Sequence, residues 1–356
     1  MSEYAFAVGH LVPMVADATS TNHWRESVEK QLNSIPSVRD LSFRKISDRW
    51  LGDRPASGIL SFRVTIPERV QNELCLSLWP AIKGVEDFIV ETWFESLSSV
   101  TFITCVGGDS ELSDPSNAVM SVREFILREL GKLEESDVTL QVLGPSPFHT
   151  DFYLSPGKGK SDYGEGLSVT LQKSRGYSRC DFFYDATLEA DPKRMLFVTF
   201  SLLARELSGY YYLVGCRNSR LEHLNDLDAE IQEQVVSLEP SGLIKYVRST
   251  VSMRHPLNAL RLSLLKAKLS FVQTARGEKE VIDLTYSGRE AQVFRSQLES
   301  EHSERYSDEI ENFESILKML EDRNSQDGQR IASFFVALVG VIVGSLLTAT
   351  LRWWAT

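Results

Sequence analysis

Cysteine and histidine are scarce in this sequence. The four cysteines, at positions 75, 105, 180 and 216, form no C-x-x-C pair, which excludes a disulfide scaffold and the common zinc ribbons. They indicate reduced thiols in a cytoplasm. The six histidines are scattered along the chain, so the sequence indicates no metal site and leaves any metal unknown.

An excess of basic residues is also lacking. Acidic residues outnumber basic ones by 49 to 38, and the resulting net charge of −11 argues against nucleic acid as a partner. The G-x-S-x-G and H-E-x-x-H motifs of hydrolases are absent. Gly159-Lys160-Ser161 is similar to the end of a Walker A loop, but Leu154 stands where that motif requires glycine. We therefore predict neither an enzyme nor a cofactor.

Two loops carry side chains of the kind that bind ligands. Asp109, Glu111 and Asp114 offer oxygen ligands that suit a hard cation, although EF-hand spacing is missing. His149 and Asp151 are close enough in sequence to form a His–Asp pair. An ordinary solvated loop explains both patterns as well. The sequence thus leaves a cation or a small molecule open as a ligand.

Residues 1–216 have the pattern of a mixed domain. Strand-like segments occur at 57–66, 87–93, 100–106, 138–143 and 167–171. Apolar residues three and four apart predict a helix over 117–133. This order of elements predicts an α/β or α+β domain with its own core, which we place in the cytoplasm.

Residues 217–328 are predicted to form a long helical stalk with an antiparallel hairpin. A first helix ends at Glu239-Pro240-Ser241-Gly242, and a second runs from Pro256 to about Arg276. Residues 277–288 form a connector with a short strand-like stretch, and a third helix covers 289–325. This third helix has a coiled-coil-like seam formed by Ile310, Phe313, Leu317 and Leu320.

Charges of opposite sign are separated along the stalk. Residues 243–276 contain seven basic residues and no acid, whereas residues 299–322 contain nine acids and two bases. An antiparallel hairpin would place these segments side by side, and each exposed pair contributes about 0.2–1 kcal/mol. The predicted pairing involves three bases and three acids: Arg261, Lys266, Lys268, Asp308, Glu309 and Glu311.

Residues 331–351 contain no charged residue, Asn, Gln or Pro. A helix of this length, at about 1.5 Å per residue, crosses a hydrocarbon core of about 30 Å. Trp353 and Trp354 suit the membrane interface, and basic residues are more frequent before the segment than after it. The sequence therefore predicts a tail-anchored, single-pass membrane protein with a cytoplasmic N-terminal domain. Residues 329–356 are its anchor, and the lipid bilayer is a partner.

A mixed domain, a helical hairpin and a long helix leading into an apolar segment resemble the architecture of CorA-like metal-ion transporters. One segment is also similar in amino-acid sequence to the end of the family's stalk helix. It reads Ile316-Leu317-Lys318-Met319-Leu320-Glu321-Asp322-Arg323-Asn324. The resemblance implies a homopentameric funnel whose first membrane helices line a pore. The sequence contains neither a second apolar span nor the family's Gly-Met-Asn loop, so no residue of that loop carries over.

The predicted membrane helix also has a stripe of small residues, which allow helices to pack closely in a bilayer. The stripe consists of Ala337, Gly340, Gly344 and Thr348. We expect a homo-oligomeric sensor or effector whose cytoplasmic domain controls a membrane-embedded part. Two alternatives stay open: a CorA-like ion channel or divalent-cation transporter, and an enzyme or scaffold tethered to a membrane.

Overall fold

The structure, a computed structural model, describes residues 4–74, 80–107, 114–133, 136–143, 147, 150–173, 178–187, 191–237, 254–287, 293–303 and 307–354. For some of these, residues 342–354 among them, it describes the backbone only. The chain divides into two compact units. Unit 1 consists of residues 1–216 and 278–303, and unit 2 of residues 217–277 and 304–356. Residues 278–303, which the sequence assigned to the stalk, therefore belong to unit 1.

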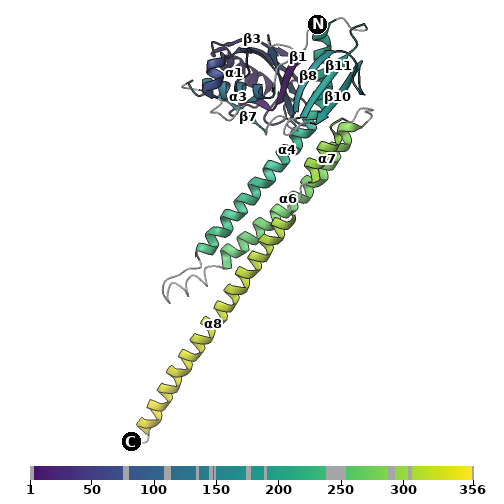
Figure 1. Ribbon diagram of the computed structural model, residues 1–356. Coiled ribbons are helices and arrows are strands. Elements are labelled where there is room, and N and C mark those ends of the chain that lie inside the picture. Colours follow the sequence, from purple (N-terminus) through teal and green to yellow (C-terminus); the bar gives the residue numbers. More distant parts are fainter. Residues whose placement is uncertain are drawn as a thin grey trace. The chain divides into compact units, whose positions relative to one another are not determined.

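A nine-stranded sheet organises unit 1 (Figure 1). In spatial order its strands are β3 (Val38–Arg44), β4 (Gly58–Thr65), β5 (Asp87–Phe94), β6 (Ser99–Val106), β1 (Tyr4–Gly9), β8 (Thr150–Pro156), β11 (Ser178–Tyr184), β10 (Leu167–Lys173) and β9 (Ser161–Gly164). Neighbouring strands are antiparallel, except that β8 and β11 are parallel. A separate two-stranded sheet pairs β2 (Leu11–Val15) with β7 (Val138–Val142). The predicted α/β domain is therefore present, with a larger sheet than its strand-like segments indicated.

Both faces of the large sheet are apolar and form separate cores. In β1, Ala7 belongs to one core, whereas Phe6 and Val8 belong to the other, because successive side chains of a strand point to opposite faces. The first core includes α1 (Thr21–Asn33) and α3 (Asn117–Leu130), and α2 (Glu68–Leu74) lies against α3. In the second core, Phe200 stacks on Phe102 with ring centroids 4.2 Å apart.

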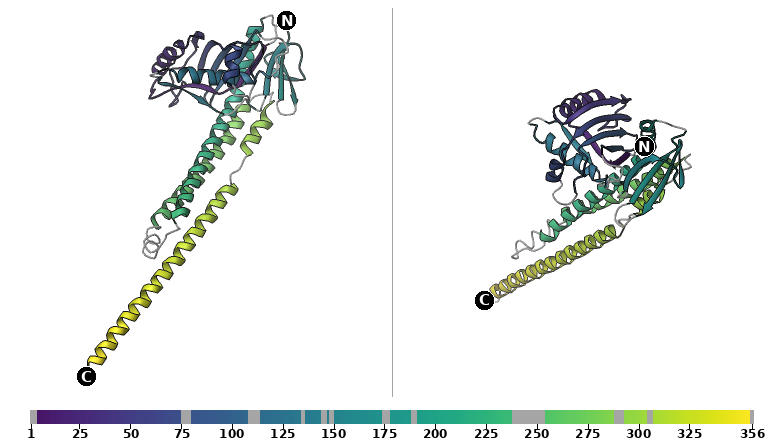
Figure 2. Two further views of the ribbon diagram at one scale, coloured as in Figure 1. Left: turned by 60° about the vertical axis from the view of Figure 1, so that its left-hand side comes forward. Right: turned by 45° about the horizontal axis from the view of Figure 1, so that its top comes forward.

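Three long helices follow the sheet. They are α4 (Pro192–Ser237), α6 (Arg254–Tyr286) and α8 (Ser307–Trp354), and the shorter α7 (Arg295–Ser303) precedes α8. Because the unit boundaries fall after Cys216 and Gly277, α4 and α6 each continue from one unit into the other. In unit 2 the three long helices pack side by side, and the C-terminal part of α8 extends beyond the other two (Figure 2). Their shared core consists of Leu224, Leu227, Ile231, Leu257, Leu260, Leu264, Ala267, Ile310, Leu317 and Leu320.

The predicted connector at 277–288 is wrong. The structure continues α6 through Gly277 to Tyr286, and it divides the helix predicted at 289–325 between α7 and α8. Ile282 and Tyr286 are buried in the second core of unit 1. This burial outweighs the strand propensity of the segment, because tertiary packing overrides weak local preferences.

The predicted transmembrane helix is contradicted. Within the part of the chain that the structure describes, no helix is long and apolar enough to cross a membrane. Of the predicted span at 331–351, the structure describes the side chains of 331–337 and 339–341, fewer than the roughly 20 apolar residues that a span requires. The other side chains of that span lie outside the described residues. The tail-anchored, single-pass membrane protein with a cytoplasmic N-terminal domain is thereby contradicted. The lipid bilayer as a partner stays a prediction from the sequence.

Candidate functional site

A fully buried carboxyl group joins four segments of unit 1. Glu206 on α4 has no exposed surface. Its oxygens accept hydrogen bonds from the hydroxyl of Tyr163 on β9 (2.8 Å), the hydroxyl of Tyr286 on α6 (2.6 Å) and the backbone N–H of Phe294 (3.2 Å). Burial of a carboxyl group is costly unless protein donors replace water. The three donors meet this requirement and hold β9, α4, α6 and the start of α7 to one side chain.

Sequence analysis missed Glu206, although the chain does contain a signal for it. Between Met195 and Cys216, Arg205 and Glu206 are the only charged residues. This part of α4 packs on the sheet, and Leu203 and Tyr210, three residues before and four residues after Glu206, are both buried. Residues three and four apart share one helix face, so Glu206 enters the core with these two side chains. An acid within an apolar helical stretch is the pattern that predicts such a site.

The helices α4 and α6 approach closely one turn beyond Glu206. A Cβ atom on Gly209 would lie 2.8 Å from Oγ1 of Thr285, which is closer than an ordinary contact. The hydroxyl of Thr285 donates to the carbonyl oxygen of Val281 at 2.8 Å. Glycine at position 209 thus permits the contact between the two helices next to the Glu206 carboxylate.

A buried cysteine lies in the same core as Glu206. Cys180 on β11 is fully buried, and this burial raises the pKa of its thiol well above the ordinary value, with smaller contributions from Asp181 and Glu206. A buried thiol with a raised pKa stays protonated and reacts poorly.

A second buried carboxyl group connects α6 to α7. Glu278 is 1% exposed, and its Oε2 lies 3.0 Å from Nδ1 of His302 on α7. Glu278 is also the first residue of α6 that belongs to unit 1. The part of α6 within unit 1 is thus held at both of its ends, by Glu278 with His302 and by Tyr286 with Glu206.

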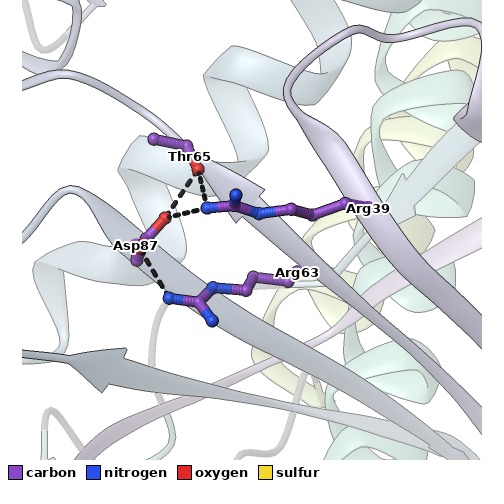
Figure 3. A network of polar contacts seen from close by, with 4 residues as sticks. All are labelled: Arg39, Arg63, Thr65 and Asp87. Atoms are coloured by element: carbon purple, nitrogen blue, oxygen red, sulfur yellow. Dashed lines mark hydrogen bonds and ion pairs between the residues drawn. The ribbon is translucent and has the colours of Figure 1, made fainter.

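Strands β3, β4 and β5 carry a charged network, shown in Figure 3. Asp87 accepts hydrogen bonds from Arg39 (2.9 Å), Arg63 (2.6 Å) and the hydroxyl of Thr65 (2.6 Å). The bond from Thr65 and, next, the pairing with Arg63 hold the pKa of Asp87 below its ordinary value, although burial opposes them. Because both guanidinium groups already face a carboxylate, the network stabilises neighbouring strands and does not form an open anion site.

A buried histidine lies at the junction of β1 and β2. His10 is 2% exposed, with Nδ1 2.8 Å from the carbonyl oxygen of Ser99 and Nε2 3.3 Å from Oε1 of Gln141. Its ring centroid is 5.3 Å from that of Tyr211 on α4. Burial lowers the pKa of His10, so the neutral imidazole is favoured.

The two loops that the sequence offered as ligand sites are only partly described. Asp109, Glu111 and His149 lie outside the described residues. Asp114 has a positive φ of 55°, and Asp151 is 7% exposed and accepts a hydrogen bond from the N-cap backbone of α3 (3.0 Å). Among the residues described, no group of three or more His, Cys, Asp or Glu could hold a metal ion.

Among the described residues, α6 and α8 form two ion pairs in unit 2. Lys268 pairs with Glu314, and Nη1 of Arg261 lies 4.0 Å from Oε1 of Glu321. Seven residues separate the two bases on α6, and seven separate the two acids on α8, in the opposite order. The two helices are therefore antiparallel, with a heptad spacing between their ion pairs.

The remaining residues of the predicted charge pairing take no part in these two bonds. Lys266 and Glu311 are exposed, and neither forms an ion pair with another described residue. The side chains of Asp308 and Glu309 lie outside the described residues. Pairing that involves these four residues stays a prediction.

The predicted stripe of small residues lies on α8. Ala337 and Gly340 are exposed, and a Cβ atom on Gly340 would meet nothing within 4 Å. Gly344 and Thr348 are in the part of α8 that is described by its backbone only. Packing of this stripe against a second copy stays a prediction.

Comparisons of the chain with protein families, with curated proteins and with solved structures found no match. The resemblance to CorA-like transporters therefore stays an expectation from the sequence.

Proposed function

We propose that the protein is a homo-oligomeric sensor or effector, in which unit 1 responds to a signal and α4 and α6 pass the response to unit 2. The observation that carries this proposal is the Glu206 site. Its carboxyl group holds α4 and α6 to each other within unit 1, and both helices then continue into unit 2.

Helix continuity supports the proposal. The backbone of an α-helix is hydrogen-bonded at every turn, so a displacement at one end is carried along its length. Packed helices shift by small translations and rotations when proteins switch between states. Tyr163 on β9 and Tyr286 on α6 both donate a hydrogen bond to the carboxyl group of Glu206 on α4. A displacement of β9 would therefore move Glu206, and with it α4, through the bond from Tyr163. It would move α6 through the bond between Glu206 and Tyr286.

The proposal does not include transport or catalysis. Ion conduction requires a membrane-spanning segment, and that prediction is contradicted among the described residues. The absence of an enzyme activity stays a prediction from the sequence, and so does a cation or a small molecule as the signal.

Hydrogen exchange tests the coupling between the units. The variant Tyr163→Phe removes one hydrogen bond from Glu206 inside unit 1 and leaves unit 2 unaltered in sequence. We expect faster amide exchange in residues 217–237 and 254–277 as well as in unit 1. The matched control is Tyr184→Phe, which removes a hydroxyl from another buried tyrosine of the same core. Exchange in unit 2 that is equal in both variants and in the wild type would contradict the proposal.

A further inference from the structure

One buried imidazole connects both sheets of unit 1 to α4. His10 stands between β1 and β2, where the chain leaves the large sheet for the small one. Its Nδ1 lies 2.8 Å from the carbonyl oxygen of Ser99 on β6, and its Nε2 lies 3.3 Å from Oε1 of Gln141 on β7. Its ring packs beside that of Tyr211 on α4, with centroids 5.3 Å apart. A change in the charge of this ring therefore acts on three elements at once.

The burial of His10 suits the neutral imidazole and not the imidazolium. The residue is 2% exposed, and a charged side chain is costly where water cannot reach it. Burial is the main reason why the pKa of His10 lies below its ordinary value, while the contacts with Ser99 and Gln141 oppose it. Neither Ser99 nor Gln141 titrates, so the charge of the site changes through His10.

The other charged groups that act on His10 come from the segment between β3 and β4. Arg54, a buried cation that donates to the carbonyl oxygen of Glu95 at 2.8 Å, disfavours the imidazolium and lowers the pKa of His10 further. Asp53, which is exposed, favours the imidazolium more weakly than Arg54 disfavours it. On α4 the titratable neighbour is Tyr211, and burial raises the pKa of its hydroxyl well above the ordinary value, so it stays neutral. Protonation of His10 thus adds a second positive charge to a buried site.

The position of Tyr211 on α4 determines which part of the molecule responds. Tyr211 is fully buried and lies shortly before Cys216, after which α4 continues into unit 2. Packed helices shift by small translations and rotations when a contact on one side is lost. Gln141 is exposed, so separation of the small sheet on this side would bring the imidazolium to water.

We propose that His10 is a proton sensor, whose protonation opens its contact with Tyr211 and displaces α4, so that unit 2 responds to a fall in pH. This inference rests on the proposed function, because α4 passes the response on, and it names a proton as the signal. Buried histidines act in this way in other pH-dependent switches.

Hydrogen exchange of the full-length chain between pH 7.5 and pH 4.5 tests the sensor. The results are expressed as protection factors, which remove the intrinsic dependence of amide exchange on pH. We expect protection in residues 11–15, 138–142 and 207–237 to fall by up to about tenfold per pH unit below 6.5, because the open state binds a proton that the closed state does not. Strand β10 lies three strands from β1 in the sheet and should keep its protection, since the opening is local.

Three variants identify the titrating group. His10→Gln keeps an amide that forms hydrogen bonds but does not titrate, so its protection should not change with pH. Asp53→Asn removes the acid that favours the imidazolium, so the pKa of His10 in the closed state falls and the loss of protection should extend to lower pH. The matched control is Asp48→Asn, which removes another exposed acid between β3 and β4 and should keep the wild-type profile.

Each outcome decides one part of the proposal. Protection that is independent of pH in the wild type, or a loss that persists in His10→Gln, would overturn the sensor. An equal loss in β10 would indicate global unfolding and would overturn it as well. A loss in unit 1 without a change in residues 217–237 would overturn the transmission to unit 2. The response of unit 2 to Tyr163→Phe is measured at a single pH, so failure of the sensor is distinguishable from failure of the proposed function.

Discussion

The hydroxyl of Tyr286 on α6 lies 2.6 Å from Oε1 of Glu206 on α4, and both residues are buried. The backbone N–H of Phe294 donates to the same oxygen, whereas Tyr163 donates to Oε2. Tyr286 is thus the residue of α6 that is hydrogen-bonded to Glu206, and this bond lies in unit 1, before α6 leaves it.

Tyr286→Phe is expected to destabilise unit 1 by about 1–3 kcal/mol, because Glu206 remains buried after losing one of its donors. Urea unfolding gives the free energy of unfolding. The double variant Tyr286→Phe with Glu206→Leu provides the control, since it removes both partners. The double variant should lose less free energy of unfolding than the two single variants lose together, because either single change already removes the hydrogen bond between the two side chains. Additive losses would contradict a direct bond between the two side chains.

Gly209→Ala and Gly215→Ala form a matched pair on α4 with opposite expected effects. The new methyl group at position 209 would meet Oγ1 of Thr285 at 2.8 Å, whereas the one at position 215 would meet only Leu143 at 3.9 Å. Overpacking costs about 1–3 kcal/mol, whereas glycine to alanine in a helix interior stabilises by about 0.5–1 kcal/mol. Thermal unfolding should therefore show a lower midpoint for Gly209→Ala and an unchanged or higher one for Gly215→Ala. A combined Gly209→Ala and Thr285→Ala variant should recover part of the loss. Equal midpoints for the two single variants would exclude the close helix contact.

Local patterns in the sequence predicted much of the fold. The strand-like segments at 57–66 and 87–93 correspond to β4 and β5, because their alternating apolar residues face a core. The pattern failed where nearly every side of a helix is buried, as over residues 206–214 of α4, which have no exposed polar face to reveal a helical period. It failed again at residues 281–286, whose helical state depends on burial among distant residues. The Glu206 site joins residues 163, 206, 286 and 294, and no local pattern brings such distant positions together.

Unit 1 is expected to lose stability as the pH falls below about 6.5, because of His10. Burial lowers the pKa of His10 from its ordinary value of 6.5, so between the two pKa values the unfolded chain binds the proton and the folded chain does not. The contribution of His10 to the free energy of unfolding is therefore fully present above pH 6.5. Below that pH it declines by up to about 1.4 kcal/mol per pH unit. Urea unfolding of wild type and His10→Gln between pH 5 and pH 8 measures the difference. The variant should have the flatter profile. Parallel profiles for wild type and His10→Gln would remove His10 as the cause.

Charge exchange between α6 and α8 is expected to show coupling at Lys268 and Glu314. The variants Lys268→Glu and Glu314→Lys each place like charges together, and the double variant restores opposite charges with their positions exchanged. Both side chains are more than a third exposed, so the coupling should be only about 0.2–1 kcal/mol. It should also fall in 1 M salt, where the screening length is about 3 Å. The control cycle uses Lys266→Glu with Glu314→Lys, because Lys266 has no ion pair among the described residues. Free energies of unfolding should be additive in this control. Coupling of equal size in both cycles would mean that the stalk responds to its overall charge and not to the register that pairs Lys268 with Glu314.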